Sequence, residues 1–318
     1  MTAAITTGRR ALLLGAAAAA GLAAPALAQG ERGLRIGYQK YGTLVLLKGR
    51  GALEQKLRGG GVRVSWTEFP AGPALLEAMN AGAIDFGTVG EAPPIFAQAA
   101  GAPLVYVAHE PPAPQGEAIL VGRDSSIRGV AELRGKKVAF NKGSNVHYLL
   151  VRALEAAGLR YADIEPATLP PADARVAFER KQVDAWVIWD PFLAAAEATT
   201  GARRLADGTG LVSNHQFYLA HERFAAANGP LVDAVVAALA ETAAWVGQDI
   251  PTAARTLSPG VGIPAPFLEV AMRRQAYGVR PVDAAVAAEQ QRIADTFHGL
   301  GLIPRAIRVS DAVRQTGA

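Results

Sequence analysis

The sequence contains no cysteine. A chain without thiols forms no disulfide, offers no thiolate to a metal ion, has no cysteine nucleophile and cannot carry a thiol-linked lipid anchor. Its stability must therefore come from core packing and hydrogen bonding, and thiol chemistry is excluded from its function.

An excess of one charge is also missing. The 318 residues include 32 lysines and arginines against 28 aspartates and glutamates, a formal net charge of +4. Nucleic-acid-binding proteins usually gather basic residues on one face, so this balance predicts no nucleic-acid partner. Half of the residues are hydrophobic and 19% are charged, which is typical of a globular chain long enough for two domains.

Long hydrophobic runs are absent except near the N-terminus, where Arg9-Arg10 precedes an apolar run from Ala11 to Ala24 and then Ala26-Leu27-Ala28. This is the order of a secretory signal, and the run is shorter than the roughly 20 residues of a membrane span. We therefore predict a signal peptide over residues 1–28, cleaved after Ala28, and a soluble periplasmic protein. The paired arginines partly match the twin-arginine route. A retained N-terminal anchor is the alternative.

Common catalytic motifs are missing too. The chain has no G-x-S-x-G elbow, no P-loop and no G-x-G-x-x-G after a strand, and its histidines lack the paired spacing of H-E-x-x-H. We therefore expect no enzyme activity, no metal and no cofactor. A secreted hydrolase or lyase is the less favoured alternative, and a structural or adhesion role is another.

Short apolar runs alternate with longer amphipathic ones from Leu34 onward: LRIGY, LVLLKGRGALEQKL, VRVSWTEF, ALLEAMNAG and IDFGTVG. Strands that alternate with helices predict an α/β fold with a parallel or mixed sheet covered by helices.

This design occurs twice. Residues 36–40 align with residues 138–142, and MNAGAIDFGTVGEAPPIFAQAAGA aligns with FERKQVDAWVIWDPFLAAAEATTG at nearly the same offset. The second alignment pairs Asp85 with Asp184 and Glu91 with Asp190. Helix and strand units resemble one another by chance, but two matches in the same order predict two related lobes. Ligands of open α/β sheets bind beyond the carboxyl ends of strands, so we expect a ligand cleft between the lobes.

Chain order predicts how the lobes are joined. We expect lobe one to contain residues 29–115 and 218–318 and lobe two to contain residues 116–217. Strand-like QGEAILVGR and NHQFYLAHERF are the expected crossings, and LVDAVVAALAETAAWV should return to lobe one. Two crossover strands would allow a hinge that closes on ligand.

The points where strands lead into helices suggest an anion site. NKGSN (141–145) and QKYGT (39–43) each join a strand to a helix, whose first N–H groups are unpaired and lie at the positive end of the helix dipole. Simple helix capping by Ser144 or Asn145 is the alternative reading. Glu91 and Asp190 each precede a helix, where first-turn acids stabilise the dipole, or they face the cleft. Aromatic residues flank these points and could cover an apolar tail: Tyr38, Tyr41, His147, Tyr148 and Trp189.

Four stretches resemble the aliphatic sulfonate-binding proteins of ABC importers, within the wider family that includes taurine, nitrate and thiamine-precursor binders: LRIGYQKYGTL (34–44), DFGTVGEAPPIFAQAAGAPLVYVA (85–108), FNKGSNVHYLLVRAL (140–154) and DAWVIWDPFLAAAE (184–197). The resemblance implies a two-lobed, type II periplasmic-binding fold. It also implies ligand contacts from Gln39, Ser144 and Asn145, from the backbone around Glu91 and Ala92, and from Trp189 and Asp190. Glu91 stands where relatives often have aspartate, and Tyr41 is bulky, so both positions can reshape the pocket.

From the residues and the resemblance together, the candidate ligand-binding residues are Gln39, Tyr41, Thr43, Glu91, Ala92, Ser144, Asn145, His147, Trp189 and Asp190. The expected function is capture of an alkyl or aryl sulfonate and delivery to a membrane permease powered by an ATPase, for sulfur acquisition. The expected partners are thus a small sulfonate and the importer subunits, with the protein a monomer. The same fold with taurine, nitrate, a sulfate ester or a thiamine pyrimidine precursor as ligand is the nearest alternative.

Overall fold

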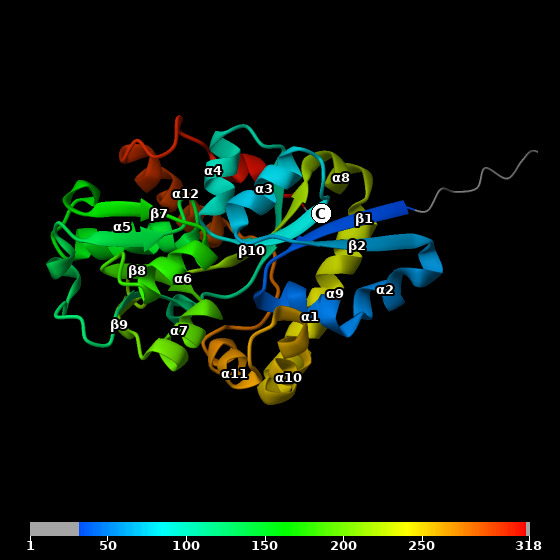
Figure 1. Cartoon of the computed structure of the whole chain (residues 1–318). Coiled ribbons are helices and arrows are strands. Elements are labelled where there is room, and N and C mark those ends of the chain that lie inside the picture. The colour runs from blue at the N-terminus through cyan, green and yellow to red at the C-terminus, as the bar shows by residue number, and fades with distance from the viewer. Residues whose placement is uncertain (1–31, 316–318) are drawn as a thin grey trace, which may run out of the picture.

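Two mixed five-stranded sheets organise residues 32–315, the part of the chain that the computed structural model describes (Figure 1). The predicted signal peptide over residues 1–28 and its cleavage after Ala28 lie outside the described residues. The sheet of lobe one contains, in spatial order, β2 (Val62–Glu68), β1 (Arg32–Tyr38), β3 (Phe86–Gly90), β10 (Gln216–His221) and β4 (Leu104–His109). The sheet of lobe two contains β7 (Glu165–Thr168), β6 (Lys137–Phe140), β8 (Ala185–Trp189), β5 (Glu117–Val121) and β9 (Arg203–Asp207).

The two sheets share one topology. β1 is parallel to its neighbours β2 and β3, and β6 is parallel to β7 and β8. The strand that follows each passage between lobes, β10 or β5, is antiparallel to both of its neighbours. The two segments aligned in the sequence, which contain β1 and β6 and then β3 and β8, therefore occupy equivalent places. The predicted two-lobed α/β fold is confirmed.

Lobe one buries apolar side chains on both faces of its sheet. Along β10, Tyr218 and Ala220 belong to one core, while Phe217 and Leu219 belong to the other, as the two-residue period of a strand requires. The first core is covered by α1 (Gly42–Arg50), α2 (Ala52–Leu57), α8 (Glu222–Ala227), α9 (Gly229–Gln248), α10 (Ile250–Val261) and α11 (Ala265–Arg273). The second is covered by α3 (Gly72–Asn80), α4 (Pro93–Ala99) and α12 (Ala284–Gly299).

Two features of lobe one refine the sequence-based expectations. The run LVLLKGRGALEQKL forms two helices rather than one, because Gly51 ends α1 in the left-handed region with φ 61°. α9 is, within residues 32–315, the helix long and apolar enough by composition to span a membrane. It contacts α1, α2, α8 and α10, so its apolar face belongs to the core of lobe one.

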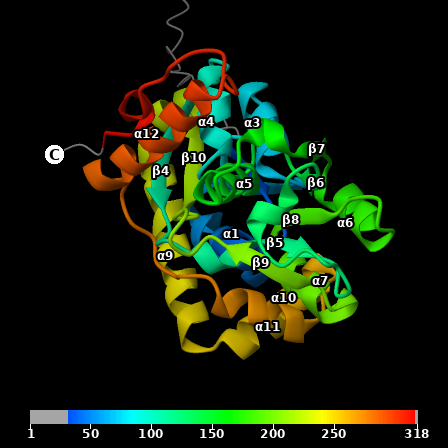
Figure 2. The same ribbon diagram turned by 90° about the vertical axis from the view of Figure 1, so that its left-hand side faces the viewer.

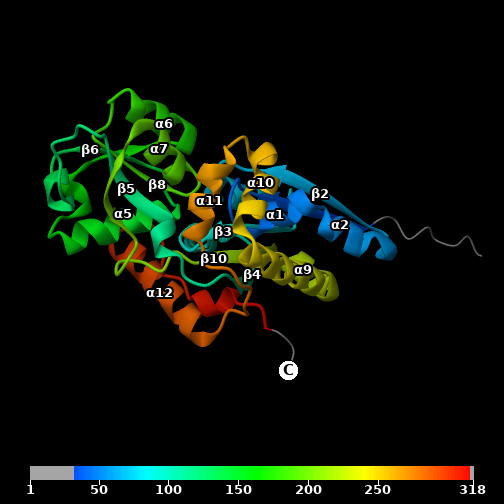
Figure 3. The same cartoon turned by 90° about the horizontal axis from the view of Figure 1, so that it is seen from below.

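Lobe two has a single core between its sheet and α5 (Asn145–Ala156), α6 (Pro171–Glu179) and α7 (Phe192–Thr200). The chain passes between lobes in residues 110–116 and 208–215, just before β5 and β10, rather than within those strands. All three views place α11 of lobe one beside α7 of lobe two (Figures 2 and 3). Short 3-10 helices occupy Arg58–Gly60, Pro114–Gly116, Val130–Leu133, Tyr161–Asp163 and Val309–Ala312.

Candidate functional site: a polar cavity between the lobes

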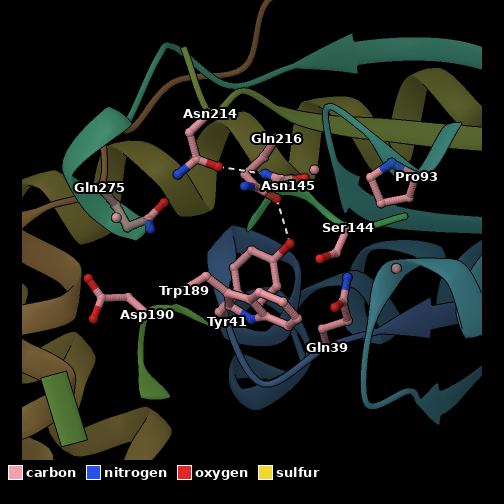
Figure 4. A pocket seen from close by; sticks show the side chains of 13 residues that line it. Gln39, Tyr41, Pro93, Ser144, Asn145, Trp189, Asp190, Asn214, Gln216 and Gln275 are labelled. Carbon is pink, nitrogen blue, oxygen red and sulfur yellow. Dashed lines mark hydrogen bonds between the residues drawn. The ribbon is translucent and has the colours of Figure 1, made fainter. Parts of the chain in front are cut away.

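A cavity lies where the ends of β1 and β3 in lobe one face the end of β6 and β8 in lobe two. The space among its lining side chains, counted together with the solvent that opens onto it, is about 340 Å³, and Figure 4 shows these side chains. The lining residues are Gln39, Tyr41, Gly72, Gly90, Pro93, Gly116, Ser144, Asn145, Trp189, Asp190, Asn214, Gln216 and Gln275. None of these thirteen residues is a lysine or an arginine.

Helix N-termini take the place of cations at this cavity. α1, α3 and α5 begin after Tyr41, Ala71 and Ser144, and none of these three residues caps its helix with a side-chain hydrogen bond. Tyr41, Gly72 and Ser144 line the cavity, so all three helices present their first turns to it. Unpaired N–H groups and the positive end of the dipole favour an anion here.

The loop between β6 and α5 brings Ser144 and Asn145 to the cavity wall. Gly143 adopts φ 75°, a conformation that glycine tolerates best, and turns the chain into the helix. The Ser144 hydroxyl donates to the Asn141 carbonyl at 2.6 Å, and Asn145 Nδ2 donates to Asn214 Oδ1 at 2.5 Å. Lys142 is exposed and does not line the cavity.

Lobe one contributes neutral groups that are held in place by hydrogen bonds. Gln39 Nε2 donates to the Thr88 carbonyl at 3.1 Å. The Tyr41 hydroxyl donates to Gln216 Oε1 at 2.7 Å, which joins α1 to β10 (Figure 4). These two hydrogen bonds fix the positions of Gln39 and Tyr41 at the cavity wall.

Asp190 contributes a carboxyl group to the cavity lining. Its carboxylate accepts from the Ala194 N–H at 3.0 Å and pairs with Arg274 at 3.4 Å, and burial raises its pKa to about 6 despite the opposing effect of Arg274. Arg274 follows α11 and also pairs with Glu197 of α7 at 2.5 Å. One arginine of lobe one thus contacts two carboxylates of lobe two.

Six of the residues predicted from the sequence lie together around the cavity: Gln39, Tyr41, Ser144, Asn145, Trp189 and Asp190. Four others do not line it: Thr43, Glu91, Ala92 and His147. Thr43 is buried in α1, and Ala92 is buried where α4 begins. His147 is fully buried, and its ring lies 4.9 Å from that of Phe140, so burial lowers its pKa to about 4.

Glu91 lies behind the cavity wall as a buried carboxyl. Its Oε2 accepts from the His215 N–H at 3.0 Å, while Oε1 has no hydrogen-bond partner among the described residues. Burial raises its pKa to about 8, and the donated N–H only partly opposes this effect. Glu117 of β5 is fully buried with both oxygens unpartnered among those residues, and burial, followed by the charge of Glu91, raises its pKa well above the ordinary value.

Sequence reasoning did not assign a ligand-facing role to Asn214, Gln216 or Gln275. The first two begin the strand NHQFYLAHERF, which the sequence marked only as a crossing between lobes. Gln275 follows α11 and has no local signal, because it reaches the cavity only through the packing of α11 against lobe two.

Comparison with known proteins places these features in a family. The model of the NMT1-like family matches residues 14–258. A protein of Escherichia coli strain K12 described as an aliphatic sulfonates-binding protein is 46% identical over 284 residues, which are 89% of this chain and 88% of that protein. A protein of Bacillus subtilis with the same description is 30% identical over 89% of this chain and 86% of its own.

Solved structures of sulfonate-binding proteins are also similar to this chain. The alkanesulfonate-binding protein SsuA of Xanthomonas axonopodis pv. citri, bound to MOPS, matches with a TM-score of 0.86 and 44% identity over 89% of this chain and 98% of its own. The periplasmic aliphatic sulphonate-binding protein SsuA of E. coli matches with a TM-score of 0.82 and 46% identity over 90% and 93%. The desulfurization enzyme DSZB shares only the fold, at 15% identity and a TM-score of 0.64. The chain belongs to the NMT1-like family and, within it, to the aliphatic sulfonate-binding proteins.

Proposed function

We propose that this protein captures an alkyl or aryl sulfonate in the periplasm and delivers it to the permease of an ABC importer. The observation that carries the proposal is a cavity between two lobes that meets an anion with three helix N-termini and neutral donors but no cationic side chain. The named binding role of the relatives supports the same ligand class.

In this proposal the sulfonate group lies among Gln39, Ser144 and Asn145 and the N–H groups that begin α1 and α5. Three sulfonate oxygens can then accept several charge-assisted hydrogen bonds. A micromolar dissociation constant, about −8 kcal/mol, needs only a few such bonds together with burial of the organic group. Tyr41 and Trp189 provide the aromatic surface for that group. Glu91 and Ala92 shape the wall from behind.

Delivery requires that the lobes close on the ligand and that the closed form docks on the permease, whose ATPase supplies the energy. No covalent bond is made or broken, so the protein is a binding component and not an enzyme.

It acts as a monomer that supplies sulfur to the cell, and the mature chain begins after Ala28. Mass spectrometry of the exported protein checks that N-terminus.

A thermal-shift screen against methanesulfonate, butanesulfonate, taurine, nitrate and sulfate tests the ligand class. A ligand at a hundred times its dissociation constant stabilises the folded state by about 2.7 kcal/mol, a shift of several degrees. We expect methanesulfonate and butanesulfonate to give this shift. Stabilisation by nitrate or sulfate alone would contradict the proposal, and a larger effect of taurine would favour the taurine alternative.

A turnover assay separates binding from catalysis. The protein is incubated with each stabilising sulfonate, and released sulfite and organic product are measured by chromatography. We expect the ligand to be recovered unchanged. Product that accumulates in proportion to protein and time would replace the binding role with an enzymatic one.

A further inference from the structure

Two buried carboxyl groups, one from each lobe, lie directly behind the wall of the polar cavity. Glu91 follows β3 of lobe one and Glu117 begins β5 of lobe two, and both residues are fully buried. The residues that precede them, Gly90 and Gly116, line the cavity. The two carboxyls are also close enough for the charge of Glu91 to raise the pKa of Glu117. The wall behind a site for an anion therefore contains two acids.

These carboxyls have few partners that would stabilise a negative charge. Glu91 Oε2 accepts from the His215 N–H, but Glu91 Oε1 and both oxygens of Glu117 have no hydrogen-bond partner within residues 32–315. Neither carboxyl forms an ion pair with a lysine or an arginine in that part of the chain. A buried carboxylate without a cation or several donors is costly, whereas its protonated form loses far less on burial. The described arrangement of the lobes therefore favours the neutral form of both groups.

The titratable side chains around the pair supply no compensating cation. They come from α1, α5, α12, the end of β8 and the two passages between lobes: Tyr41, Tyr148, Glu289, Asp190, Glu110 and His215. Burial raises the pKa of Tyr41 and of Tyr148, so both phenols stay neutral. The His215 ring lies beside Glu289, with Nε2 3.5 Å from Oε2, and Asp190 is paired with Arg274.

Closure of the lobes brings the pair together with the ligand. A Cβ at Gly90 would lie 1.9 to 2.2 Å from the Asn145 amide of lobe two, so the wall in front of Glu91 is packed against the other lobe. Separation of the lobes would admit water to this wall and allow the carboxyls to ionise. Closure around a sulfonate removes that water and adds another negative charge nearby, and both changes favour protonation.

We infer that Glu91 and Glu117 couple sulfonate capture to proton uptake, so that the pair is protonated when the lobes close on the anion and releases its protons when they open. The inference rests on the proposed function, because the anion must be held in the polar cavity. A sulfonate stays ionised at neutral pH, so the protons come from the medium. Uptake of one proton per ligand raises the dissociation constant about tenfold for each unit of rising pH.

The pKa of Glu91 gives the direction and the range of this effect. Burial raises the pKa from 4.5 to about 8 in the described arrangement. Ligand binding gains from the proton of Glu91 below this value and loses that gain as pH rises through about 8.

Isothermal titration of the whole mature protein with butanesulfonate tests the coupling without any substitution. Titrations at pH 7.5 in imidazole and in Tris, which differ in heat of ionisation and contain no sulfonate, count the protons taken up. We expect at least about 0.5 proton per ligand, and a dissociation constant that rises at least about tenfold from pH 6.5 to 8.5. No proton uptake together with equal affinity at both pH values overturns the inference and leaves the proposed function standing. Failure of every sulfonate to bind at either pH defeats the proposed function itself.

Substitution by glutamine identifies the groups that take up the protons, because the amide keeps the size of the side chain and fixes it in a neutral form. The double variant Glu91→Gln, Glu117→Gln should take up less than about a third of the protons of the wild type, and its affinity should vary less than about threefold between pH 6.5 and 8.5. Glu77→Gln, on an exposed site of α3, is the matched control and should keep the wild-type values. Undiminished uptake in the double variant assigns the protons to another group, such as Asp190, and overturns the inference. If the double variant does not fold, Glu117→Gln alone should lower the uptake by about half.

Discussion

At the scale of the residue, two fully buried carboxyl groups, Glu91 in lobe one and Glu117 in lobe two, make the protein sensitive to pH. Glu91 directly follows β3, and Glu117 begins β5. The pKa of each is raised first by burial, and the charge of Glu91 raises that of Glu117 further. Both favour the protonated form in the folded protein, so stability should depend on pH in the neutral range.

The pKa of Glu91 rises from 4.5 to about 8 on folding. The folded state therefore binds a proton that the unfolded state has lost, and the contribution of Glu91 is fully present below pH 4.5 and is lost as pH rises through about 8. Each pKa unit corresponds to about 1.4 kcal/mol, so Glu91→Gln should remove a fall of a few kcal/mol between pH 5 and 8. Urea denaturation across this range measures it. Glu77→Gln, on an exposed site, is the control, and an unchanged slope in Glu91→Gln would count against the assignment.

Gly90 is a close contact point between the two lobes. A Cβ at this position would lie 1.9 to 2.2 Å from the amide group of Asn145 in the other lobe. Gly90→Ala should displace that side chain, break its hydrogen bond to Asn214 and weaken sulfonate binding at least about tenfold. Titration calorimetry measures the loss. Gly33→Ala, where nothing lies within 4 Å, is the control, and full affinity in Gly90→Ala would show that the lobes close without this contact.

At the scale of the element, the same hydrogen bond fixes equivalent strands of the two sheets, β1 and β6. The Arg35 N–H donates to Asp85 Oδ2 at 2.8 Å, and the Lys137 N–H donates to Asp184 Oδ2 at 2.8 Å. These aspartates precede β3 and β8, which lie beside β1 and β6. The repeat therefore extends to individual hydrogen bonds.

The two aspartates should differ in their contribution to stability. Asp85 is buried and also accepts from Arg35 Nε at 3.0 Å and from an Arg35 terminal nitrogen at 2.5 Å, whereas Asp184 is exposed. We expect Asp85→Ala to lower the free energy of unfolding by about 2 to 3 kcal/mol and Asp184→Ala by about 1 kcal/mol. Urea titrations give both values. Equal losses would show that the shared backbone bond, and not the arginine, carries the effect.

At the scale of the whole molecule, contacts between α11 and α7 hold the described arrangement of the lobes. Arg274 provides the ionic part, since it pairs with Asp190 beside the cavity and with Glu197 on α7. The side chain of Arg274 is only 13% exposed, so solvent screens these pairs less than surface pairs. Asp190 therefore both lines the cavity and takes part in the ion pair that joins the lobes.

Arg274→Gln should therefore shift the molecule towards an open form and raise the ligand dissociation constant by about tenfold, mainly through faster dissociation. Small-angle scattering with and without sulfonate measures closure, and stopped-flow fluorescence measures dissociation. Arg273→Gln is the matched control. Arg273 is the neighbouring residue, and its side chain pairs with Glu269 inside α11. If the Arg274→Gln protein still closes and binds tightly, the ion pairs of Arg274 do not hold the lobes together.

The local sequence pattern singled out several residues that the structure brings together at one cavity. Gln39, Ser144 and Asn145 follow buried strands and begin helices, and the structure places all three on the cavity. The same reasoning extended too far along each helix. His147 lies two residues after Asn145, about 200° around the helix, and so points into the core instead of the cavity.

The sequence by itself determined the α/β alternation, the repeat that makes two similar lobes, and the helix N-termini that line up with strand ends. These features depend on short-range periodicity and on the chemistry of capping, which neighbouring residues specify. Only the tertiary structure decided that Asn214, Gln216 and Gln275 join the cavity and that Arg274 links the lobes. The reason is physical: periodicity states which face of an element is buried, but the docking of distant elements determines which buried faces meet and what space they leave.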